Sequence, residues 1–472
     1  MVSALIIALG SRGDTEPCFA LAKSLIHSGN FHRLDICIQA EYMHLVPSDN
    51  RIHIHQFSFS TKNFAKTYYY EYFKDSFLSF FTRNFDASRP SRRCLASIIK
   101  QFFVPELPFL NEIATKENPS LLIATTLGGL IATTLAQQLN IPMWLINFQP
   151  TTPTAAYPYY MSGNKTAAVA GKNVVQMFSH FDETPENRQN IASYEIQQEA
   201  HKNSLSYINT YRSTCCLPSM DMSDVDALFS GRLENVYVLN AFSPQLIPRS
   251  MDWTEHVHQV SALAADYIPS GWSPEKKCPK LKEYLSTAKR PICVSFGSMN
   301  VAEKKTIVTR ELFKALRATG INQVVLLKGS CDLGAHNLTA SDSELKRWAD
   351  DHVFFSEEPS QLAWLLPQCS GLICHGGAGT TFAGLRAGIP VIIAPLFCDQ
   401  FFWGHVVQGR QLGSVAEPNL RDATADAYKT ALKKALSEQT IHRVEKYSQK
   451  EKNACGSVAA AELIVSSIPS TS

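Results

Sequence analysis

The sequence predicts an α/β protein built from two Rossmann-like, doubly wound domains, and three observations support this prediction. Short apolar runs alternate with amphipathic, helix-like runs in both halves of the chain, a pattern typical of parallel sheets covered by helices on both faces. At 472 residues the chain is too long for one small core and suits two domains of roughly 200 residues each. Residues 244–289 are repeatedly interrupted by proline and form the expected linker between the halves.

The first domain is expected to cover residues 1–243. Its opening apolar run, residues 4–9, is short, follows no basic segment and leads directly into a glycine loop, so we predict a buried strand rather than a signal peptide. The other predicted strands of this domain cover residues 33–39, 51–57, 120–126 and 141–148, and its predicted helices cover residues 16–27 and 130–139. Right-handed crossovers would wind these elements into one parallel sheet.

The second domain, residues 290–443, repeats this arrangement without repeating the sequence. Its predicted strands cover residues 291–296, 323–328, 352–356, 371–374 and 391–395, and its predicted helices cover residues 306–318, 360–369, 382–387 and 401–408. The last segment, residues 444–472, contains a further helix-like run over residues 444–464, and the end of the chain after Ser466 is expected to fray.

The composition excludes several classes of function. Apolar residues make up 45% of the chain and charged residues 18%, as in an ordinary soluble globular protein. The formal net charge of +2 gives no indication of a nucleic-acid partner. No apolar run approaches the roughly 20 residues needed to span a bilayer. The 12 cysteines are scattered and form no CxxC pair, so we expect reduced thiols and a cytoplasmic location, with at most a peripheral contact to membranes.

The most informative motif runs from residue 375 to residue 381 and combines an imidazole, a glycine-rich turn and two hydroxyls. It lies between the predicted strand 371–374 and a helix-like run, where backbone N–H groups and the helix dipole favour an anion. Ordinary structural roles are the alternative, because a lone histidine after an apolar strand is usually a core residue and glycines can simply form a tight turn. The predicted anion-binding residues are His375, Gly376, Gly377, Gly379, Thr380 and Thr381.

Two further groups are expected at the same edge of the second sheet. Asp399 and Gln400 follow the apolar strand 391–395, and a carboxylate beside an amide at the carboxyl end of a sheet suits the hydroxyls of a sugar. Ser298 follows the strand 291–296 and is expected to reach a diphosphate from the other side. The alternative for both groups is a helix cap. A diphosphate site and a polyol site on one edge together predict a nucleotide-sugar pocket.

Several of these motifs resemble the family 1 glycosyltransferases. The stretches HGGAGTT, LRAGIP and DQFFWG, within residues 362–413, are similar to the donor signature of that family and especially to its sterol and lipid glucosyltransferase branch. The N-terminal stretch GSRGDTEP, residues 10–17, resembles the same branch and also the bacterial enzymes that glycosylate antibiotics. The resemblance implies the GT-B architecture, in which the two domains face each other across a cleft. It also implies that acceptors bind to the first domain, donors bind to the second, and the last helix packs back on the first.

Asp14 is the predicted catalytic base, because it lies in the loop after the first strand beside glycines that let a ligand approach. Many plant relatives have a histidine in this loop, whereas the sterol-like branch has Asp. A carboxylate with a pKa of about 4 is a weak base, so burial in a closed cleft has to raise its pKa. The alternative role of Asp14 is to cap the helix that begins near Glu16. The other near-site residues of this loop are Gly10, Ser11, Arg12 and Gly13.

The nucleobase is expected to bind near Ser356. Plant relatives stack the base on a tryptophan at the start of their donor block, whereas this chain has Phe355, Ser356 and two glutamates in that region. Phe355 or backbone groups near Ser356 would therefore hold the base. The resemblance favours UDP and leaves dTDP and GDP open. Because Asp221, Asp224 and Asp226 are loosely spaced and no DxD-like cluster is found in a cleft loop, we expect neither a metal nor a cofactor beyond the UDP-sugar co-substrate.

Other clusters have ordinary explanations beside functional ones. Residues 68–81 are dense in aromatic side chains and residues 151–160 in Thr, Tyr and Pro, which either pack helices or line a pocket for an apolar acceptor. The arginines within residues 89–93 either lie in a solvated loop or contact anionic lipid head groups weakly. Two histidine pairs share a strand face without an evident third metal ligand, namely His53 with His55 and His256 with His258.

Together these features predict an inverting, metal-independent glycosyltransferase. It would move a hexose, expected to be glucose, from a UDP-sugar to a hydroxyl of an apolar small molecule such as a sterol, a terpenoid or another lipid-like or secondary metabolite. No nucleic-acid partner is expected, and the oligomeric state is left open. Two alternatives stay open, a nucleotide-sugar-binding protein without turnover and a sugar-nucleotide epimerase with twin Rossmann-like domains. Asp14, His375 and the Asp399–Gln400 pair favour transfer.

Overall fold

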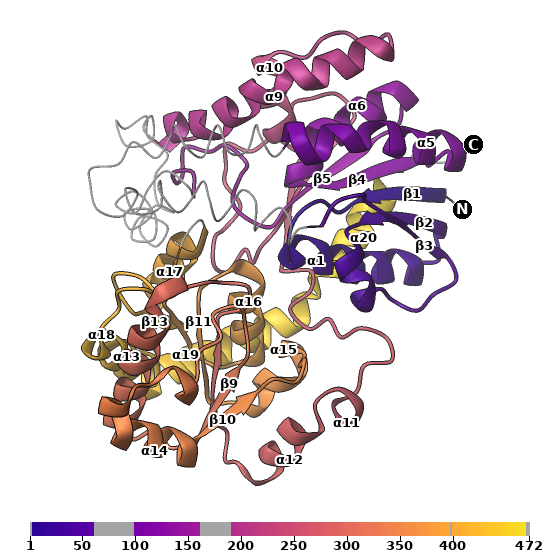
Figure 1. Ribbon diagram of the computed structural model, residues 1–472. Helices are drawn as coiled ribbons and strands as arrows, with labels where there is room; N and C mark the ends of the chain where they lie inside the picture. The colour runs from indigo at the N-terminus through magenta and orange to yellow at the C-terminus, as the bar shows by residue number, and fades with distance from the viewer. Residues whose placement is uncertain (1, 61–98, 161–189, 397–398, 469–472) are drawn as a thin grey trace. The chain divides into compact units, whose positions relative to one another are not determined.

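The computed structural model describes residues 2–60, 99–160, 190–396 and 399–468 (Figure 1). The chain divides into two compact units. Of the described residues, unit 1 contains 2–60, 99–160, 190–264 and 455–468, and unit 2 contains 265–396 and 399–454. Within the described residues, the chain passes from one unit to the other at residues 264–265 and again at residues 454–455.

The described part of unit 1 contains a seven-stranded parallel sheet in the order β3-β2-β1-β4-β5-β6-β7. The strands are β1 Val2–Ile7, β2 Phe31–Ile38, β3 Ile52–Gln56, β4 Leu121–Thr125, β5 Met143–Asn147, β6 Val236–Ala241 and β7 Val257–Val260. The α-helices are α1 Arg12–His27, α5 Leu107–Glu117, α6 Gly129–Leu139, α9 Glu195–Thr214, α10 Met222–Phe229 and α20 Gly456–Ser466. Every residue of β4 and β5 is buried, which explains why both strands are continuous apolar runs.

The described part of unit 2 contains a six-stranded parallel sheet in the order β10-β9-β8-β11-β12-β13. The strands are β8 Ile292–Ser295, β9 Val324–Leu327, β10 Val353–Ser356, β11 Gly371–Cys374, β12 Val391–Ile393 and β13 Gly413–Val415. The α-helices are α11 Pro274–Lys277, α12 Pro279–Thr287, α13 Lys305–Ala318, α14 Ser343–His352, α15 Leu362–Leu365, α16 Ala378–Ala387, α17 Asp399–Gly409, α18 Ala425–Ala435 and α19 Glu438–Ala454. None of the helices in the described ranges of either unit is both long and apolar enough to cross a membrane.

Each sheet has a point where the order of the strands reverses. This switch point lies between β1 and β4 in unit 1 and between β8 and β11 in unit 2. The connections that leave such neighbouring strands diverge and leave a crevice at the carboxyl edge, where ligands of open α/β sheets bind. The chain after β1 leads to Asp14, and the loops after β8 and β11 carry Ser298 and His375. The prediction of two doubly wound sheets is confirmed, with predicted site residues beside both switch points.

The linker predicted at residues 244–289 differs from the structure. Residues up to Ala264 belong to unit 1 and include its edge strand β7. The sequence pattern concealed β7 because this short strand contains His258 and Gln259, and an edge strand buries less apolar surface than a central one. The helix predicted over residues 444–464 is also divided, since Cys455 has a φ of 29° and separates α19 from α20.

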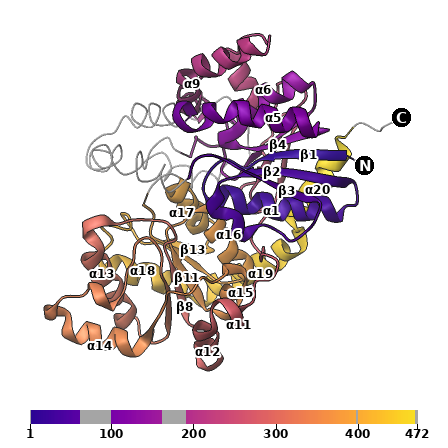
Figure 2. The same cartoon turned by 45° about the vertical axis from the view of Figure 1, so that its right-hand side comes forward.

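Helix α20 is part of unit 1 and packs against α1 and β7. Figures 1 and 2 both show it in yellow beside the indigo α1. Ser24 Oγ of α1 donates to Ser457 Oγ at 3.0 Å, and Trp144 Nε1 of β5 donates to Ser467 Oγ at 3.0 Å. The end of the chain therefore completes the packing of the unit that contains its beginning.

Asp35 of β2 is a buried carboxylate with three hydrogen bonds, and we expect its loss to destabilise unit 1. Arg33 Nε and Nη2 donate to it at 2.7 and 2.8 Å, and His55 Nε2 lies 2.7 Å from its Oδ1. Burial alone raises the pKa of Asp35, but the hydrogen bonds and charges of Arg33 and His55 outweigh burial and lower the pKa to about 2. The resulting stabilisation is present above the unfolded-state pKa of about 3.9. It is lost as the pH falls through the folded-state value of about 2. Asp35→Asn is expected to lower the free energy of unfolding in urea titrations by about 3 kcal/mol.

Asp49 provides a matched control for Asp35, because it also pairs with an arginine two residues away. Arg51 Nη2 lies 2.8 Å from Asp49 Oδ2, but these side chains are 41% and 24% exposed. Exposed ion pairs contribute at most about 1 kcal/mol, so Asp49→Asn should change the free energy of unfolding by less than that. Equal losses in the two variants would contradict the importance of burial at Asp35.

Candidate functional site

The crevice of unit 2 brings together the loops that follow β8 and β11. Cys374 at the end of β11 is paired with Ser295 at the end of β8, so the residues that follow leave the sheet side by side. A Cβ on Gly297 would lie 3.4 Å from Cε1 of His375, which shows that the ring packs against the backbone of the β8 loop. Ser298 is the next residue of this loop and is exposed. Two residues predicted from separate motifs are thus brought to one crevice.

His375 is a buried imidazole whose Nδ1 faces no protein acceptor or donor among the described residues. The residue is 9% exposed. Burial lowers the pKa of His375 to about 4, although the nearby Ser295 backbone opposes the shift. The imidazole is therefore neutral at pH 7 and donates from Nδ1 when that nitrogen carries the proton. A buried polar atom without a partner costs about 1–3 kcal/mol, which a ligand oxygen at Nδ1 would recover.

Gly376 and Gly377 are required to be glycines by their surroundings. Gly376 has a φ of 90°, and a Cβ there would lie 2.6 Å from Cγ2 of Ile393 and 3.1 Å from the carbonyl oxygen of Gln400. A Cβ on Gly377 would lie 2.6 Å from Nε2 of His375. The turn therefore packs its bare backbone against His375 on one side and against the start of α17 on the other.

The predicted anion-binding motif spans the N-terminus of α16. This helix begins at Ala378, four residues before the predicted start at residue 382, so its first N–H groups and positive dipole end lie within the motif. In the first turn, Gly379 is exposed and Thr380 is partly exposed. Thr381 is completely buried instead, and its hydroxyl has no hydrogen-bond partner in the described part of the chain. Thr380 is thus better placed than Thr381 to reach a ligand from solvent.

Asp399 and Gln400 are held in fixed positions beside the Gly376 turn. They are the first residues of α17 rather than residues preceding it, and they are 9% and 3% exposed. Trp403 Nε1 donates to Asp399 Oδ2 at 3.1 Å, and the Leu396 backbone N donates to Gln400 Oε1 at 2.7 Å. Gln400 Nε2 lies 3.2 Å from Sδ of Met299, in the loop after β8. The crevice therefore joins the loops after β8, β11 and β12.

The predicted nucleobase region lies at the same edge of the sheet, where β9 and β8 separate β10 from β11. Ser356 ends β10 and is 3% exposed, and its Oγ lacks a hydrogen-bond partner among residues that the structure describes. Its carbonyl accepts from the Lys328 backbone N at 2.8 Å. Phe355 meets His336 edge-on, with ring centroids 5.7 Å apart. Whether a base binds here stays a prediction.

Asp14 lies in unit 1, in the first turn of α1 beside the switch point of that sheet. Ser11 is the N-cap of α1, and its backbone N and its Oγ donate to Asp14 Oδ2 at 2.7 and 2.9 Å. This arrangement is a capping box. The capping role is therefore present, and α1 begins at Arg12 rather than near Glu16. Both bonds reach Oδ2, so the capping box does not use Oδ1.

The surroundings of Asp14 make its carboxylate a stronger base. Burial raises the pKa of Asp14, and the two hydrogen bonds from Ser11 reduce this rise without cancelling it. A higher pKa improves proton abstraction near neutral pH. Gly10 is required for the close approach, since its φ is 141° and a Cβ there would lie 2.3 Å from Asp14 Oδ2. Arg12 pairs with Glu16, with Nε 2.8 Å from Oε2, and the Gly13 backbone N donates to Ser11 Oγ.

The stretches predicted to contact an acceptor are only partly described. Residues 68–81 and the arginines of residues 89–93 lie outside the described residues. Residues 151–160 follow β5 and are anchored by Asp252, whose carboxylate accepts from Thr154 Oγ1 at 2.8 Å and from the Ala155 backbone N at 2.7 Å. This connection is therefore a packed element of unit 1.

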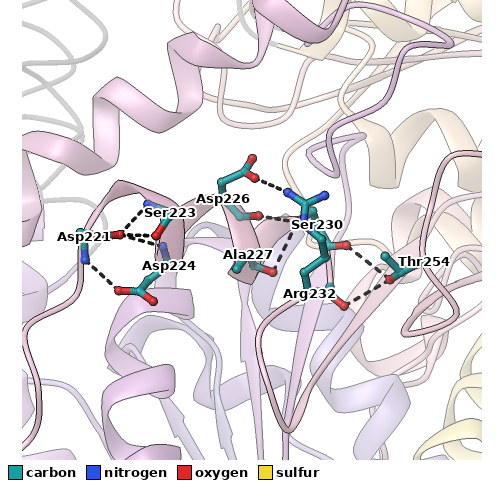
Figure 3. A network of polar contacts seen from close by, with 9 residues as sticks. Asp221, Ser223, Asp224, Asp226, Ala227, Ser230, Arg232 and Thr254 are labelled. Carbon is teal, nitrogen blue, oxygen red and sulfur yellow. Dashed lines mark hydrogen bonds and ion pairs between the residues drawn. The ribbon is translucent and has the colours of Figure 1, made fainter.

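The acidic cluster at residues 221–226 caps a helix. Oδ1 of Asp221, the N-cap of α10, accepts from the backbone N of Ser223 at 2.7 Å and of Asp224 at 3.2 Å (Figure 3). Oδ2 of Asp224 accepts from the Asp221 backbone N at 2.8 Å, and Asp226 pairs with Arg232. In the ranges that the structure describes, no group of three or more His, Cys, Asp or Glu residues could hold a metal ion.

Removing the cap at Asp221 should affect stability and not turnover. We expect Asp221→Ala to lower the free energy of unfolding by about 1 kcal/mol, because the first N–H groups of α10 lose their acceptor. Thermal denaturation and a turnover assay on the same preparation check this prediction. A loss of turnover at unchanged stability would show that the cluster has a role beyond capping.

The histidine pairs and the buried cysteines also have structural surroundings. His55 bonds to Asp35, and His256 and His258 lie 5.3 and 6.4 Å from the ring centroid of Tyr237. Cys37, Cys293 and Cys374 are buried, as the sequence predicts, and are free cysteines.

Some supporting residues of the unit 2 crevice were not predicted. Met299 and Trp403 hold Gln400 and Asp399 in place. Gly329 lets the loop after β9 pass close to the loop after β8, since a Cβ there would lie 2.4 Å from the Gly297 carbonyl oxygen. Trp403 could have been found, because it lies one helical turn after Asp399 in the same motif. No feature of the sequence marks Met299 or Gly329 for these contacts.

Comparison with known sequences identifies similar proteins. Residues 360–464 match the C-terminal domain family of erythromycin biosynthesis protein CIII-like proteins. Over 94% of its length the chain is 24% identical to a sterol 3-beta-glucosyltransferase of Saccharomyces cerevisiae, and over 98% it is 26% identical to one of Cryptococcus neoformans. Over 98% it is 24% identical to sterol 3-beta-glucosyltransferase UGT80B1 of Arabidopsis thaliana. The chain spans 34%, 28% and 68% of the lengths of these three relatives, which is about a third for the fungal proteins.

Solved structures share the fold over almost the whole chain. The glycotransferase of kitacinnamycin matches with a TM-score of 0.63 and 17% identity over 99% of both chains. The glycosyltransferase VinC, solved in complex with dTDP, matches with a TM-score of 0.62 and 15% identity over 98% of both chains. The predicted resemblance is thus confirmed: the chain has the GT-B fold and is a relative of the family 1 glycosyltransferases, with sterol 3-beta-glucosyltransferases similar to it over nearly its whole length.

Proposed function

We propose that this chain is an inverting, metal-independent glycosyltransferase that moves a hexose, in the first instance glucose, from a UDP-sugar to a hydroxyl of a sterol-like, apolar acceptor. The observation that carries the proposal is the buried Nδ1 of His375, which has no partner among the described residues and lies at the N-terminus of a helix in the switch-point crevice. The similarity to sterol 3-beta-glucosyltransferases over more than nine tenths of the chain supports the same activity.

The donor is proposed to bind in unit 2. Its diphosphate would accept hydrogen bonds from Nδ1 of His375, from Thr380 and from the first N–H groups of α16, with Ser298 on the opposite side of the crevice. These groups are preorganised, because the glycines beside His375 fix the turn and leave no room for side chains. Preorganised donors and a helix dipole stabilise the negative charge that grows on the leaving diphosphate without reorganising during the reaction.

The sugar is proposed to bind to Asp399 and Gln400. Trp403 and Leu396 hold these side chains by hydrogen bonds, so little side-chain entropy would be lost when they bind hydroxyl groups. The nucleobase is proposed to lie near Ser356 and Phe355 at the same sheet edge, and the resemblance to the family 1 glycosyltransferases favours UDP.

Asp14 is proposed to be the base. Its carboxylate would remove the proton of the acceptor hydroxyl while that oxygen attacks the anomeric carbon and the diphosphate leaves. One displacement inverts the anomeric configuration, and no covalent enzyme intermediate is formed. The raised pKa of Asp14 supports this role. Cytoplasmic location and peripheral membrane contact stay predictions.

The experiment that tests the proposal is incubation with UDP-glucose and a mixed panel of sterols and terpenoids, read by mass spectrometry and by the anomeric configuration of the product. An acceptor carrying one added hexose with inverted configuration is the expected result. Isomerised donor would support the epimerase, and UDP-glucose binding without any product would support a binding protein without turnover. Full activity in the presence of a strong metal chelator is expected, and activity that depends on an added divalent metal would contradict the metal-independent mechanism.

A further inference from the structure

Arg386 holds both segments by which the described chain leaves unit 2. It lies in the last turn of α16. Its Nη2 lies 2.8 Å from Oδ2 of Asp266, one residue after the passage at 264–265. The same Nη2 lies 3.5 Å from the carbonyl oxygen of Lys452, two residues before the passage at 454–455, and Nη1 donates to the carbonyl of Glu451. One guanidinium group therefore ties the two segments to each other and to α16.

The surroundings make this contact specific for arginine. The side chain of Arg386 is 12% exposed, whereas that of Asp266 is 61% exposed. A guanidinium group presents several N–H donors in a rigid plane, so it can serve a carboxylate and two carbonyls that a single ammonium group could not reach together. Ser448 Oγ of α19 also donates to the carbonyl of Arg386 at 2.5 Å, which fastens the end of α16 to α19 a second time.

The same two segments also touch within unit 1. A Cβ on Gly456 would lie 2.1 Å from the carbonyl oxygen of Ser261 and 2.7 Å from that of Ala262. Gly456 follows the passage at 454–455 by one residue, and Ser261 precedes the passage at 264–265 by three. The two passages are thus in contact in unit 1 and joined by Arg386 in unit 2.

We propose that Arg386 is a positioning residue that fastens the two passages into a single hinge and connects this hinge to the candidate anion site through α16. The helix is ten residues long, with His375 and its glycines at the N-terminal end and Arg386 at the C-terminal end. A ligand that fixes one end of a short, rigid helix also fixes the other. The hinge itself follows from contacts inside each unit, whereas its coupling to donor binding rests on the proposed function.

The test compares three variants with the wild-type protein. Asp266→Ala removes an exposed partner of Arg386 and should leave the fold of unit 2 intact. Arg386→Gln removes the guanidinium group and with it the contacts to Asp266, Glu451 and Lys452. Glu275→Ala is the control, because Glu275 is 57% exposed and pairs with Lys282, and neither residue is among the contacts of Arg386. Thermal denaturation checks folding, and small-angle X-ray scattering without ligand measures the spread of overall dimensions. Calorimetry measures the Kd of UDP, and a glycosyl-transfer assay measures kcat and the KM of the acceptor.

We expect Asp266→Ala to broaden the scattering-derived size distribution, to leave the Kd of UDP unchanged, and to lower kcat by about 3- to 30-fold with little change in the acceptor KM. Arg386→Gln should have the larger effect and Glu275→Ala none. Unchanged scattering in both test variants would overturn the hinge. Broadened scattering with an unchanged kcat would overturn the coupling. If the two test variants show broadened scattering but the wild-type protein binds no UDP, the hinge is supported and the proposed function is refuted.

Discussion

Asp14→Asn is expected to lower kcat by about 10²- to 10⁴-fold while UDP binding is retained, because the amide cannot accept the proton of the acceptor hydroxyl. Asp14 lies in unit 1, whereas the candidate donor residues lie in unit 2. The wild-type kcat/KM should fall as the pH decreases through the raised pKa of Asp14, since protonation removes the base. Steady-state kinetics across pH and UDP calorimetry measure both effects, and the variant should lack this acidic limb.

Asp224→Asn separates the catalytic role of Asp14 from its role in a capping box. Asp224 occupies the same third position in the capping box of α10, where its Oδ2 accepts from the Asp221 backbone N at 2.8 Å. The two variants should therefore lose a similar, small amount of stability, and only Asp14→Asn should lose turnover. Full transfer by Asp14→Asn, or an equal loss of turnover in both variants, would refute Asp14 as the base.

Gly376→Ala is expected to damage both the stability of unit 2 and its affinity for UDP. The positive φ of 90° disfavours any residue with a Cβ, and the added methyl group would lie 2.6 Å from Cγ2 of Ile393 and 3.1 Å from the Gln400 carbonyl. Strain and overpacking together should lower the free energy of unfolding by about 2–4 kcal/mol. The displaced turn should weaken UDP binding at least about tenfold, which corresponds to the loss of one charge-assisted hydrogen bond. Urea unfolding and calorimetry provide the two measurements.

Gly379→Ala is the matched control for Gly376→Ala. Gly379 lies in the same motif but inside the first turn of α16, and a Cβ there would meet no atom within 4 Å. Alanine favours a helix by about 1 kcal/mol over glycine, so this variant should be as stable as the wild type or slightly more stable. Equal stability of the two variants would show that the tight packing around Gly376 does not constrain the turn.

Periodicity predicted most of the framework, because central strands of a parallel sheet are continuous apolar runs. The predicted strand at residues 371–374 matches β11. The sequence did not reveal β6, β7 and β13. Of these, β7 and β13 are edge strands, where polar residues such as His258 and Gln259 are tolerated, whereas β6 lies between β5 and β7. The predicted helix starts at residues 16 and 382 lie four residues after the true starts of α1 and α16. The first turns of these helices contain glycines and hydroxyl residues, which are typical of loops. Cap and ligand-binding positions share these residue types, so sequence patterns do not separate them.

The candidate site was predicted where a motif joins neighbouring residues and missed where distant loops meet. Motif spacing places His375 and the glycines at a helix start without any knowledge of contacts. The contact between Gly297 and His375 depends on the pairing of β8 with β11, which no local pattern encodes. Arg386 lies in the LRAGIP stretch, but nothing in that pattern predicts its contacts, and only the fold reveals that it joins Asp266 to the end of α19.

The most direct test of the central claim, that a nucleotide diphosphate binds at the N-terminus of α16 against His375, is an imidazole ¹⁵N NMR titration with UDP at neutral pH. The signal of His375 is assigned as the one absent from His375→Gln, and it should show a neutral ring before UDP is added because burial lowers the pKa to about 4. The claim predicts a saturable shift of its Nδ1 resonance as UDP binds. A full UDP titration that leaves this resonance in place would contradict it.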